Sequence, residues 1–347
     1  MSEQLLPIIF KADHLQILDQ RRLPNEIVYN KRRTIEEVFH AIKDMELRGA
    51  PLIGITAAYG MYLSILDFKG DSKALLKQLR DNGKYLVKAR PTAVNLDWAI
   101  KRMISKAEKN EKKEISEIKK ELLSEALLIN KEDVEICKNI GENLLTLLKK
   151  GDGLLTHCNA GALATYKYGT ATAPMYLGHE RGWNFKIFAD ETRPYNQGAR
   201  LTAFELSEAG MDVTLICDNM AGVVMSQKKV DAVIVGCDRV ASNGDAANKI
   251  GTMTLSILAK EFGIPFYIAA PTPTIDMETP SGKEIPIEER SHEEITTFKG
   301  ERVAPENISV YNPAFDVSPA ENITAIVTEK GIVYPPYKEN LAKLMKG

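Results

Sequence analysis

The chain has 347 residues, 44% of them hydrophobic, and its 45 lysine and arginine residues nearly balance 47 aspartate and glutamate residues. This length predicts two packed domains, and the formal net charge of −2 excludes a broad basic field for nucleic acid or an anionic membrane. No apolar run approaches the roughly 20 residues of a membrane span, and the start lacks a basic segment followed by an apolar one, so we expect a cytoplasmic protein.

The first part of the chain, residues 1–125, is expected to form a helix-rich N-terminal domain. Apolar residues recur at helical spacing over residues 34–47 and again over residues 51–66. Residues 105–150 are highly charged, but their leucines and isoleucines still recur every three or four positions. We therefore predict solvated helices here, which bridge to a second domain spanning residues 126–347.

Two basic residues in the N-terminal domain precede predicted helices. Arg48 is followed by Gly49, Ala50 and Pro51, so small residues leave the backbone open, and proline fits the first turn of a helix. Arg90 likewise precedes a proline and a helical pattern. One such feature would be ordinary capping, but two, with Lys249 as a third basic residue, suggest an anion held between the domains.

After Gly151, short apolar runs rich in β-forming residues alternate with helical patterns. The predicted strands lie within residues 153–158, 185–190, 212–218, 231–238, 265–270 and 323–328. This alternation predicts an α/β fold with a doubly wound parallel sheet, in which ligands bind beyond the carboxyl ends of the strands. The side chains at those ends are Cys158, Asp190, Glu191, Asp218 and Asp238. No Gly-x-Gly-x-x-Gly motif follows these strands, so nothing favours a dinucleotide.

Cys158 follows one of these strands and precedes a run of small residues that favours a helix packed closely on the sheet. A thiol at a helix N-terminus has a lowered pKa and thiolate character. The alternative is a buried structural cysteine. The chain has four cysteines without a Cys-x-x-Cys pair, and its five histidines are scattered, so we expect neither a disulfide scaffold nor a metal site.

Asp238 ends another predicted strand and opens a glycine- and asparagine-rich loop. Partial desolvation there would raise the pKa of its carboxyl group and let it donate a proton. The alternative is a structural aspartate that caps a helix or binds loop N–H groups, for which Asp245 is the better candidate. Asn248 and Lys249 are predicted in a first helical turn, where they could hold hydroxyl and phosphate groups, although a surface lysine is the simpler interpretation of Lys249 alone.

The segment after the second strand is dense in hydrogen-bonding side chains. Glu191, Arg193, Asn196, Gln197 and Arg200 fall within one loop and helix start. This composition suits a polyhydroxylated ligand. An internal salt bridge is an equally good interpretation of Glu191 and Arg193.

Several long segments resemble the 5-methylthioribose-1-phosphate isomerase family of methionine salvage. They are LRGAPLIG, RPTAVNLDWA, THCNAGALAT, ADETRPYNQGARLTAFEL, VGCDRVASNGDAANKIGT, APTPTIDMETPSGKEIPIEER and NPAFDVSPAENITAIVTEKG. The likeness covers most of the chain in order. The wider superfamily includes archaeal ribose-1,5-bisphosphate isomerases and regulatory subunits of the guanine-nucleotide exchange factor of translation initiation.

The resemblance implies conversion of 5-methylthioribose 1-phosphate to 5-methylthioribulose 1-phosphate by an aldose–ketose isomerase. It implies a Rossmann-like second domain, a homodimer and no required cofactor. From composition and charge we expect no metal, and neither nucleic acid nor membrane as a partner. Cys158 and Asp238 become the catalytic pair. The implied substrate-binding residues are Arg48, Gly49, Ala50, Arg90, Gln197, Asn248 and Lys249. A ribose-1,5-bisphosphate isomerase and a non-enzymatic regulatory subunit that binds a sugar phosphate remain as alternatives.

Overall fold

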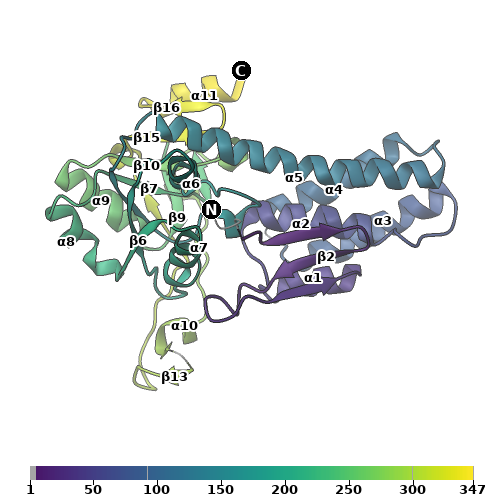
Figure 1. Ribbon diagram of the computed structural model, residues 1–347, viewed down its shortest axis with the longest axis horizontal. Coiled ribbons are helices and arrows are strands. Elements are labelled where there is room, and N and C mark those ends of the chain that lie inside the picture. Colours follow the sequence, from purple (N-terminus) through teal and green to yellow (C-terminus); the bar gives the residue numbers. More distant parts are fainter. Residues whose placement is uncertain (1–4, 92, 299, 347) are drawn as a thin grey trace. The chain divides into compact units, whose positions relative to one another are not determined.

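The computed structural model describes residues 5–91, 93–298 and 300–346, which form two compact units (Figure 1). The N-terminal unit consists of Gln4–Glu135 together with Gly161–Gly169. The C-terminal unit contains Ile136–Ala160 and Thr170–Gly347. The predicted α/β class with a helix-rich first part is confirmed. No helix among the described residues is both long and apolar enough to cross a membrane.

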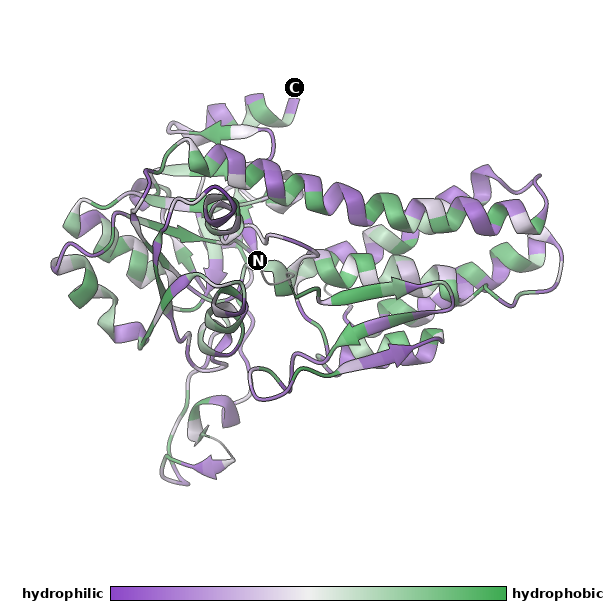
Figure 2. Cartoon of the chain, viewed as in Figure 1, coloured by the Kyte–Doolittle hydropathy of each residue, from purple (hydrophilic) through white to green (hydrophobic). Residues whose placement is uncertain are grey.

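The N-terminal unit begins with a three-stranded antiparallel sheet, which the sequence patterns did not indicate. Its strands are β1 (Ile8–Lys11), β2 (His14–Leu18) and β3 (Tyr29–Arg32). The helices that follow are α1 (Ile35–Lys43), α2 (Ala50–Leu63), α3 (Ser72–Val87), α4 (Val94–Lys109) and the first part of α5 (Ile115–Leu145). From Ile136 onward, α5 belongs to the C-terminal unit. Figure 2 shows hydrophilic and hydrophobic residues alternating along α5, as one packed and one solvated face require.

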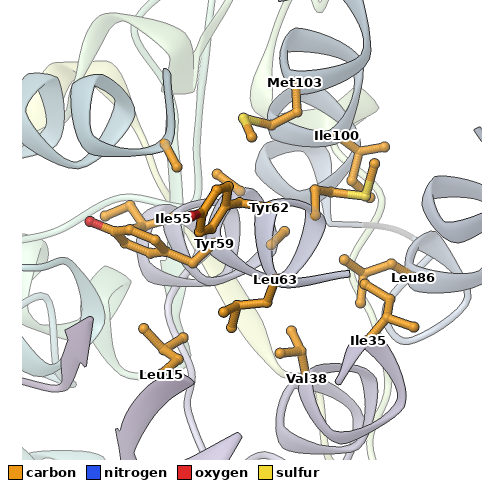
Figure 3. Close-up of a cluster of buried hydrophobic side chains, with 14 of the residues drawn as sticks. Leu15, Ile35, Val38, Ile55, Tyr59, Tyr62, Leu63, Leu86, Ile100 and Met103 are labelled. Atoms are coloured by element: carbon orange, nitrogen blue, oxygen red, sulfur yellow. The ribbon is translucent and has the colours of Figure 1, made fainter. Parts of the chain in front are cut away.

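The core of the N-terminal unit surrounds α2, which is apolar on nearly every side. Leu15, Val38, Leu86 and Met103 pack around it from four other elements (Figure 3). Tyr59 of α2 is fully buried and stacks on Phe10, with 4.8 Å between the ring centroids. A helix buried on all faces can be held rigidly, and this fixes the position of its N-terminus.

The C-terminal unit is built on a seven-stranded sheet in the order β16-β15-β10-β7-β4-β5-β6. The strands are β4 (Gly153–Thr156), β5 (Lys186–Asp190), β6 (Asp212–Ile216), β7 (Ala232–Val235), β10 (Phe266–Ala269), β15 (Ala325–Thr328) and β16 (Gly331–Val333). Each of the six strands predicted from the sequence is present, and these six are parallel to one another. The edge strand β16 is antiparallel to β15.

The helices of this unit are α6 (Ala173–Glu180), α7 (Ala203–Glu208), α8 (Ala221–Ser226), α9 (Thr252–Phe262), α10 (Glu293–Thr296) and α11 (Tyr337–Lys346). A smaller sheet joins β11 (Ile275–Asp276), β8 (Arg239–Ala241), β9 (Ala246–Lys249) and β14 (Phe315–Ser318), in that order. A short hairpin pairs β12 (Thr297–Phe298) with β13 (Glu301–Arg302).

Candidate active site

The strand order places the two predicted catalytic residues on either side of a topological switch point. From β4, the chain adds β5 and β6 on one side and then β7, β10 and β15 on the other. In such sheets the crevice at the reversal, beyond the carboxyl ends of the two central strands, is where ligands bind. Cys158 follows β4 and Asp238 follows β7, and these two strands are parallel neighbours.

The loops that carry these two residues touch each other. A Cβ atom added at Gly236 would lie 2.4 Å from the Cβ of Ala160, closer than two side-chain carbons can approach. Gly236 is two residues before Asp238, and Ala160 is two residues after Cys158. The absence of a side chain at Gly236 therefore allows the two loops to pack together at the switch point.

Cys158 is buried and held in a left-handed backbone conformation, with φ of 62°. Its N–H donates to Thr192 Oγ1 at 2.8 Å, and its carbonyl accepts from Thr202 Oγ1 at 2.5 Å. Its thiol donates to Gln197 Oε1 at 3.5 Å. Two predicted site residues, Cys158 and Gln197, are thus in direct contact.

The predicted helix directly after Cys158 is wrong. A three-residue 3₁₀ turn, Ala162–Ala164, replaces it, and the next α-helix begins only at Ala173. The physical reason is that Gly161–Gly169 packs in the N-terminal unit instead of along the sheet. Cys158 therefore has no helix N-terminus to stabilise a thiolate, and its strained backbone and its hydrogen bonds define its environment.

The strain at Cys158 is shared by the loop that holds it. Thr192 has φ of 64° and Asn196 has φ of 56°, and a β-branched residue such as threonine rarely adopts this conformation. Asp218 stabilises it, since its carboxylate accepts the N–H groups of Thr192 and Arg193, each at 2.7 Å. Strained residues that are fixed by several hydrogen bonds concentrate at functional sites.

Asp238 differs from the sequence expectation in its surroundings. Asp238 is exposed directly before the β8–β9 hairpin, whereas the sequence predicts partial desolvation. Its N–H donates to the carbonyl of Ala247 at 2.9 Å. Burial and the charge of Asp238 raise the pKa of the neighbouring Cys237 thiol well above its usual value.

Asn248 and Lys249 end strand β9, and their predicted place in a first helical turn is wrong. Pairing with β14 keeps the chain extended until Lys249, and α9 starts at Thr252. Asn248 Nδ2 donates to Thr252 Oγ1 at 3.0 Å, and Lys249 Nζ lies 4.4 Å from the centroid of the Phe315 ring. Asp245, proposed as a structural aspartate, accepts from the N–H groups of Gly282 and Ala320, both at 2.9 Å.

The salt bridge considered for Arg193 and Glu191 is not formed among the described residues. Arg193 donates instead to the carbonyls of Pro194, at 2.7 Å, and Glu294, at 3.3 Å. The guanidinium groups of Arg193 and Arg200 also lie over aromatic rings, those of Phe298 and Tyr195. These contacts fix the loop around Gln197.

His157 and Asp190 form a buried pair that the sequence did not predict. His157 Nδ1 lies 2.9 Å from Asp190 Oδ2, and both side chains are 1% exposed. Burial raises the pKa of Asp190 to about 6, reinforced by the charges of Asp218 and Glu191 and opposed by the His157 hydrogen bond. The sequence shows that His157 is adjacent to Cys158. Asp190, the partner of His157, lies 33 residues away.

With Asp218, this pair forms a group of side chains whose spacing would suit a metal ion. His157, Asp190 and Asp218 each place one ligand atom within 4.8 Å of the others. However, both ring nitrogens of His157 already have partners, and both Asp218 oxygens accept backbone N–H groups. A metal would have to displace these bonds, so we assign none here.

The remaining predicted residues gather in the N-terminal unit. Gly49 precedes α2 with φ of 99°, and a Cβ there would lie 2.2 Å from the Ala164 carbonyl oxygen, so only glycine fits. Arg48 and Ala50 flank it at a helix start where no side chain caps the helix. Arg90 lies in the turn before α4.

The N-termini of α2 and α4 are neighbours. A Cβ added at Gly54, in the second turn of α2, would lie 3.0 Å from the carbonyl oxygen of Asn95, in the first turn of α4. Arg48 and Arg90 therefore precede two adjacent helix starts.

The sequence model of the Initiation factor 2 subunit family matches residues 46–335, which is most of the chain. The chain belongs to this family. A member named 5-deoxyribose 1-phosphate isomerase, from Clostridium botulinum (strain Kyoto / Type A2), is 64% identical over 335 residues, or 96% of each protein.

Two solved structures of the family superpose closely on this chain. The 5-methylthioribose 1-phosphate isomerase of Pyrococcus horikoshii OT3 has a TM-score of 0.96 at 45% identity, covering 99% of this chain and 97% of that one. The translation initiation factor eIF-2B, subunit delta, of A. fulgidus has a TM-score of 0.93 at 44% identity, covering 99% and 100%.

Proposed function

We propose that this chain isomerises 5-deoxyribose 1-phosphate to 5-deoxyribulose 1-phosphate. The observation that carries the proposal is the 64% identity, over 96% of both proteins, with the C. botulinum protein named for that substrate. The proteins similar to this chain include two that are named as sugar-phosphate isomerases. The chain is a sugar-phosphate isomerase of the Initiation factor 2 subunit family, and so an intramolecular oxidoreductase.

The reaction oxidises C2 and reduces C1 within one molecule. The phosphate on the anomeric oxygen prevents simple ring opening to an aldehyde, so we propose that Asp238 protonates the ring oxygen and opens the ring. The hydrogen on C2 then moves to C1, and C2 becomes a ketone. Atoms balance without a cofactor, because the hydrogen lost by C2 is gained by C1. The proton that Asp238 gives to the ring oxygen is replaced by the proton that the C2 hydroxyl loses when it becomes the ketone.

Two routes for this hydrogen remain open. If it moves as a proton, the Cys158 thiolate removes it from C2 and returns it to C1 through an enediol. If it moves as a hydride, Cys158 stabilises the charge that develops on the sugar, while Asp238 donates and accepts the protons. Substrate deuterated at C2 separates the routes, since hydride transfer retains the label at C1, whereas proton transfer allows exchange with water.

5-Methylthioribose 1-phosphate is the second candidate substrate. It is favoured by the P. horikoshii structure, which carries that name, and by the sequence resemblance. The two sugars differ only in the apolar group at C5. A small apolar difference changes selectivity by about 10- to 200-fold, so one site can serve both sugars.

The experiment is a comparison of kcat/KM for three sugars. We expect turnover of 5-deoxyribose 1-phosphate and of 5-methylthioribose 1-phosphate, with values within about 200-fold of each other. Ribose 1,5-bisphosphate should react far more slowly, because a second phosphate needs further cations. A purified protein that converts none of the three would refute the proposal and favour the non-enzymatic alternative.

Arg48 provides a test of substrate binding. Arg48→Ala should raise KM about 10- to 100-fold with little change in kcat, because one charge-assisted bond to phosphate is lost. The matched control is Arg80→Ala, which removes an exposed arginine that pairs with exposed Glu108. An unchanged KM in Arg48→Ala would remove this residue from the phosphate site.

A further inference from the structure

His157 connects three segments of the C-terminal unit. It directly follows β4 and precedes Cys158. Its Nδ1 faces Asp190 at the end of β5, at 2.9 Å. Its Nε2 lies 2.8 Å from the carbonyl oxygen of Ile250, in the turn that follows Asn248 and Lys249. One imidazole ring therefore joins the cysteine segment to the lysine segment.

The turn at Ile250 is shaped around this ring. Gly251 has φ of 104°, and a Cβ added there would lie 2.8 Å from His157 Cε1 and 2.9 Å from Nε2. Its N–H and that of Met253 donate to the two carboxylate oxygens of Asp316, at 2.7 and 2.9 Å. The start of α9 is thus fixed from both sides, by His157 and by Asp316.

The hydrogen-bond partners determine how many protons the pair of His157 and Asp190 holds. A carbonyl oxygen can only accept, so Nε2 of His157 must carry a hydrogen for the contact with Ile250. The contact between Nδ1 and the Asp190 carboxyl group also needs one proton between the two atoms. The pair therefore holds one proton more than a neutral histidine beside an ionised aspartate.

Three carboxyl groups surround the ring: Asp190 from β5, Asp218 after β6 and Asp316 from β14. Burial alone would lower the pKa of His157, but the hydrogen bond and charge of Asp190, the charge of Asp218 and the Ile250 carbonyl outweigh it and raise the pKa. Protonation of the ring is therefore favoured by every charged group named here.

We propose that His157 is a buried imidazolium that acts as a positioning residue for the isomerase reaction. Its bond to Asp190 fixes the segment of Cys158, and its bond to Ile250 fixes the segment of Asn248 and Lys249. The effect on activity rests on the proposed function, whereas the charge state of the ring does not.

The charge state is tested directly in the wild-type protein by ring ¹⁵N NMR. The chain has five histidines, so the His157 signals can be assigned by their loss in a His157→Asn variant. At pH 7 both ring nitrogens should show the shifts of a protonated imidazolium. A neutral tautomer at pH 7 would overturn the proposal, and this result is independent of catalysis.

Two substitutions separate the two bonds. His157→Asn places an amide nitrogen where Nδ1 was and keeps a donor to Asp190, whereas His157→Gln places one near Nε2 and keeps the donor to Ile250. We expect His157→Asn to raise KM and His157→Gln to lower kcat, each about 10- to 100-fold, because each loses one strong hydrogen bond. A purely structural role would lower the melting temperature of both variants without this split, and would also overturn the proposal.

The pH profile gives a third readout. Above about pH 6, the pKa of Asp190, the pair of His157 and Asp190 has lost its first proton. It loses the second as the pH rises through the raised pKa of His157. Asp190→Asn removes the counter-ion, so the alkaline limb of kcat should shift to lower pH. An unshifted limb in this variant would contradict the proposal. A wild-type protein without turnover would instead refute the proposed function and leave the NMR result standing.

Discussion

Cys158→Ser is expected to lower kcat about 10³-fold or more while substrate still binds, because general acid–base groups typically contribute 10²–10⁴-fold. A serine hydroxyl can keep the hydrogen bond to Gln197 Oε1 and the same backbone, but it is a far weaker acid than a thiol. The loss should therefore fall on the chemical step. Steady-state kinetics with 5-deoxyribose 1-phosphate, together with calorimetric measurement of Kd, checks both parts.

Cys217→Ser is the matched control for this variant. Cys217 is an exposed thiol in the same unit, so its replacement changes the same atom without disturbing a core. We expect its kcat to remain near the wild-type value. A Cys158→Ser enzyme within about threefold of wild type would exclude the thiol from catalysis, since such a change is under 1 kcal/mol in barrier height.

Asp238→Asn should have the second largest effect, a fall in kcat of about 10²–10⁴-fold. The amide has the size of the carboxyl group but cannot deliver a carboxylic proton to the ring oxygen. The bond from the Asp238 N–H to the carbonyl of Ala247 involves only the backbone and is retained. Substrate affinity and melting temperature should therefore stay close to those of the wild type.

Asp212→Asn provides the control, because this exposed aspartate begins β6 at the opposite, amino edge of the same sheet. It should turn over substrate at the wild-type rate. Because Asp238 is exposed in the chain alone, its desolvation must come with bound substrate if it is the acid. Equal kcat for Asp238→Asn and Asp212→Asn would show that Asp238 is not the proton donor.

The strands and their carboxyl ends could be predicted because short, apolar β-forming runs leave few alternatives. Parallel pairing then brings Cys158 and Asp238 to one edge of the sheet without further information. The helix predicted after Cys158 was wrong because small residues fit two structures equally well, a helix on the sheet or a close-packed loop. Only the packing of residues 161–169 in the N-terminal unit decides between them.

The environment of the site was less accessible from the sequence. Asn248 and Lys249 precede a helical pattern, but pairing with β14, more than 60 residues later, keeps them in a strand. The partners of His157 are 33 and 93 residues away, so no local pattern reports them. Burial of Asp190 and exposure of Asp238 likewise depend on tertiary packing, which the spacing of apolar residues along the sequence does not predict.

Because Gly161–Gly169 belongs to the N-terminal unit, this unit contains residues that are synthesised after part of the C-terminal unit. Leu163 accepts a bond from Gln20 at 2.7 Å, and the Tyr166 N–H donates to Asp133 at 2.9 Å, so the N-terminal unit is finished by residues that follow the first strand of the other unit. During synthesis, Gln4–Glu135 cannot complete this unit until the segment Gly161–Gly169 has left the ribosome. A fragment that ends after α5 would therefore lack Gly161–Gly169, the segment that completes the N-terminal unit.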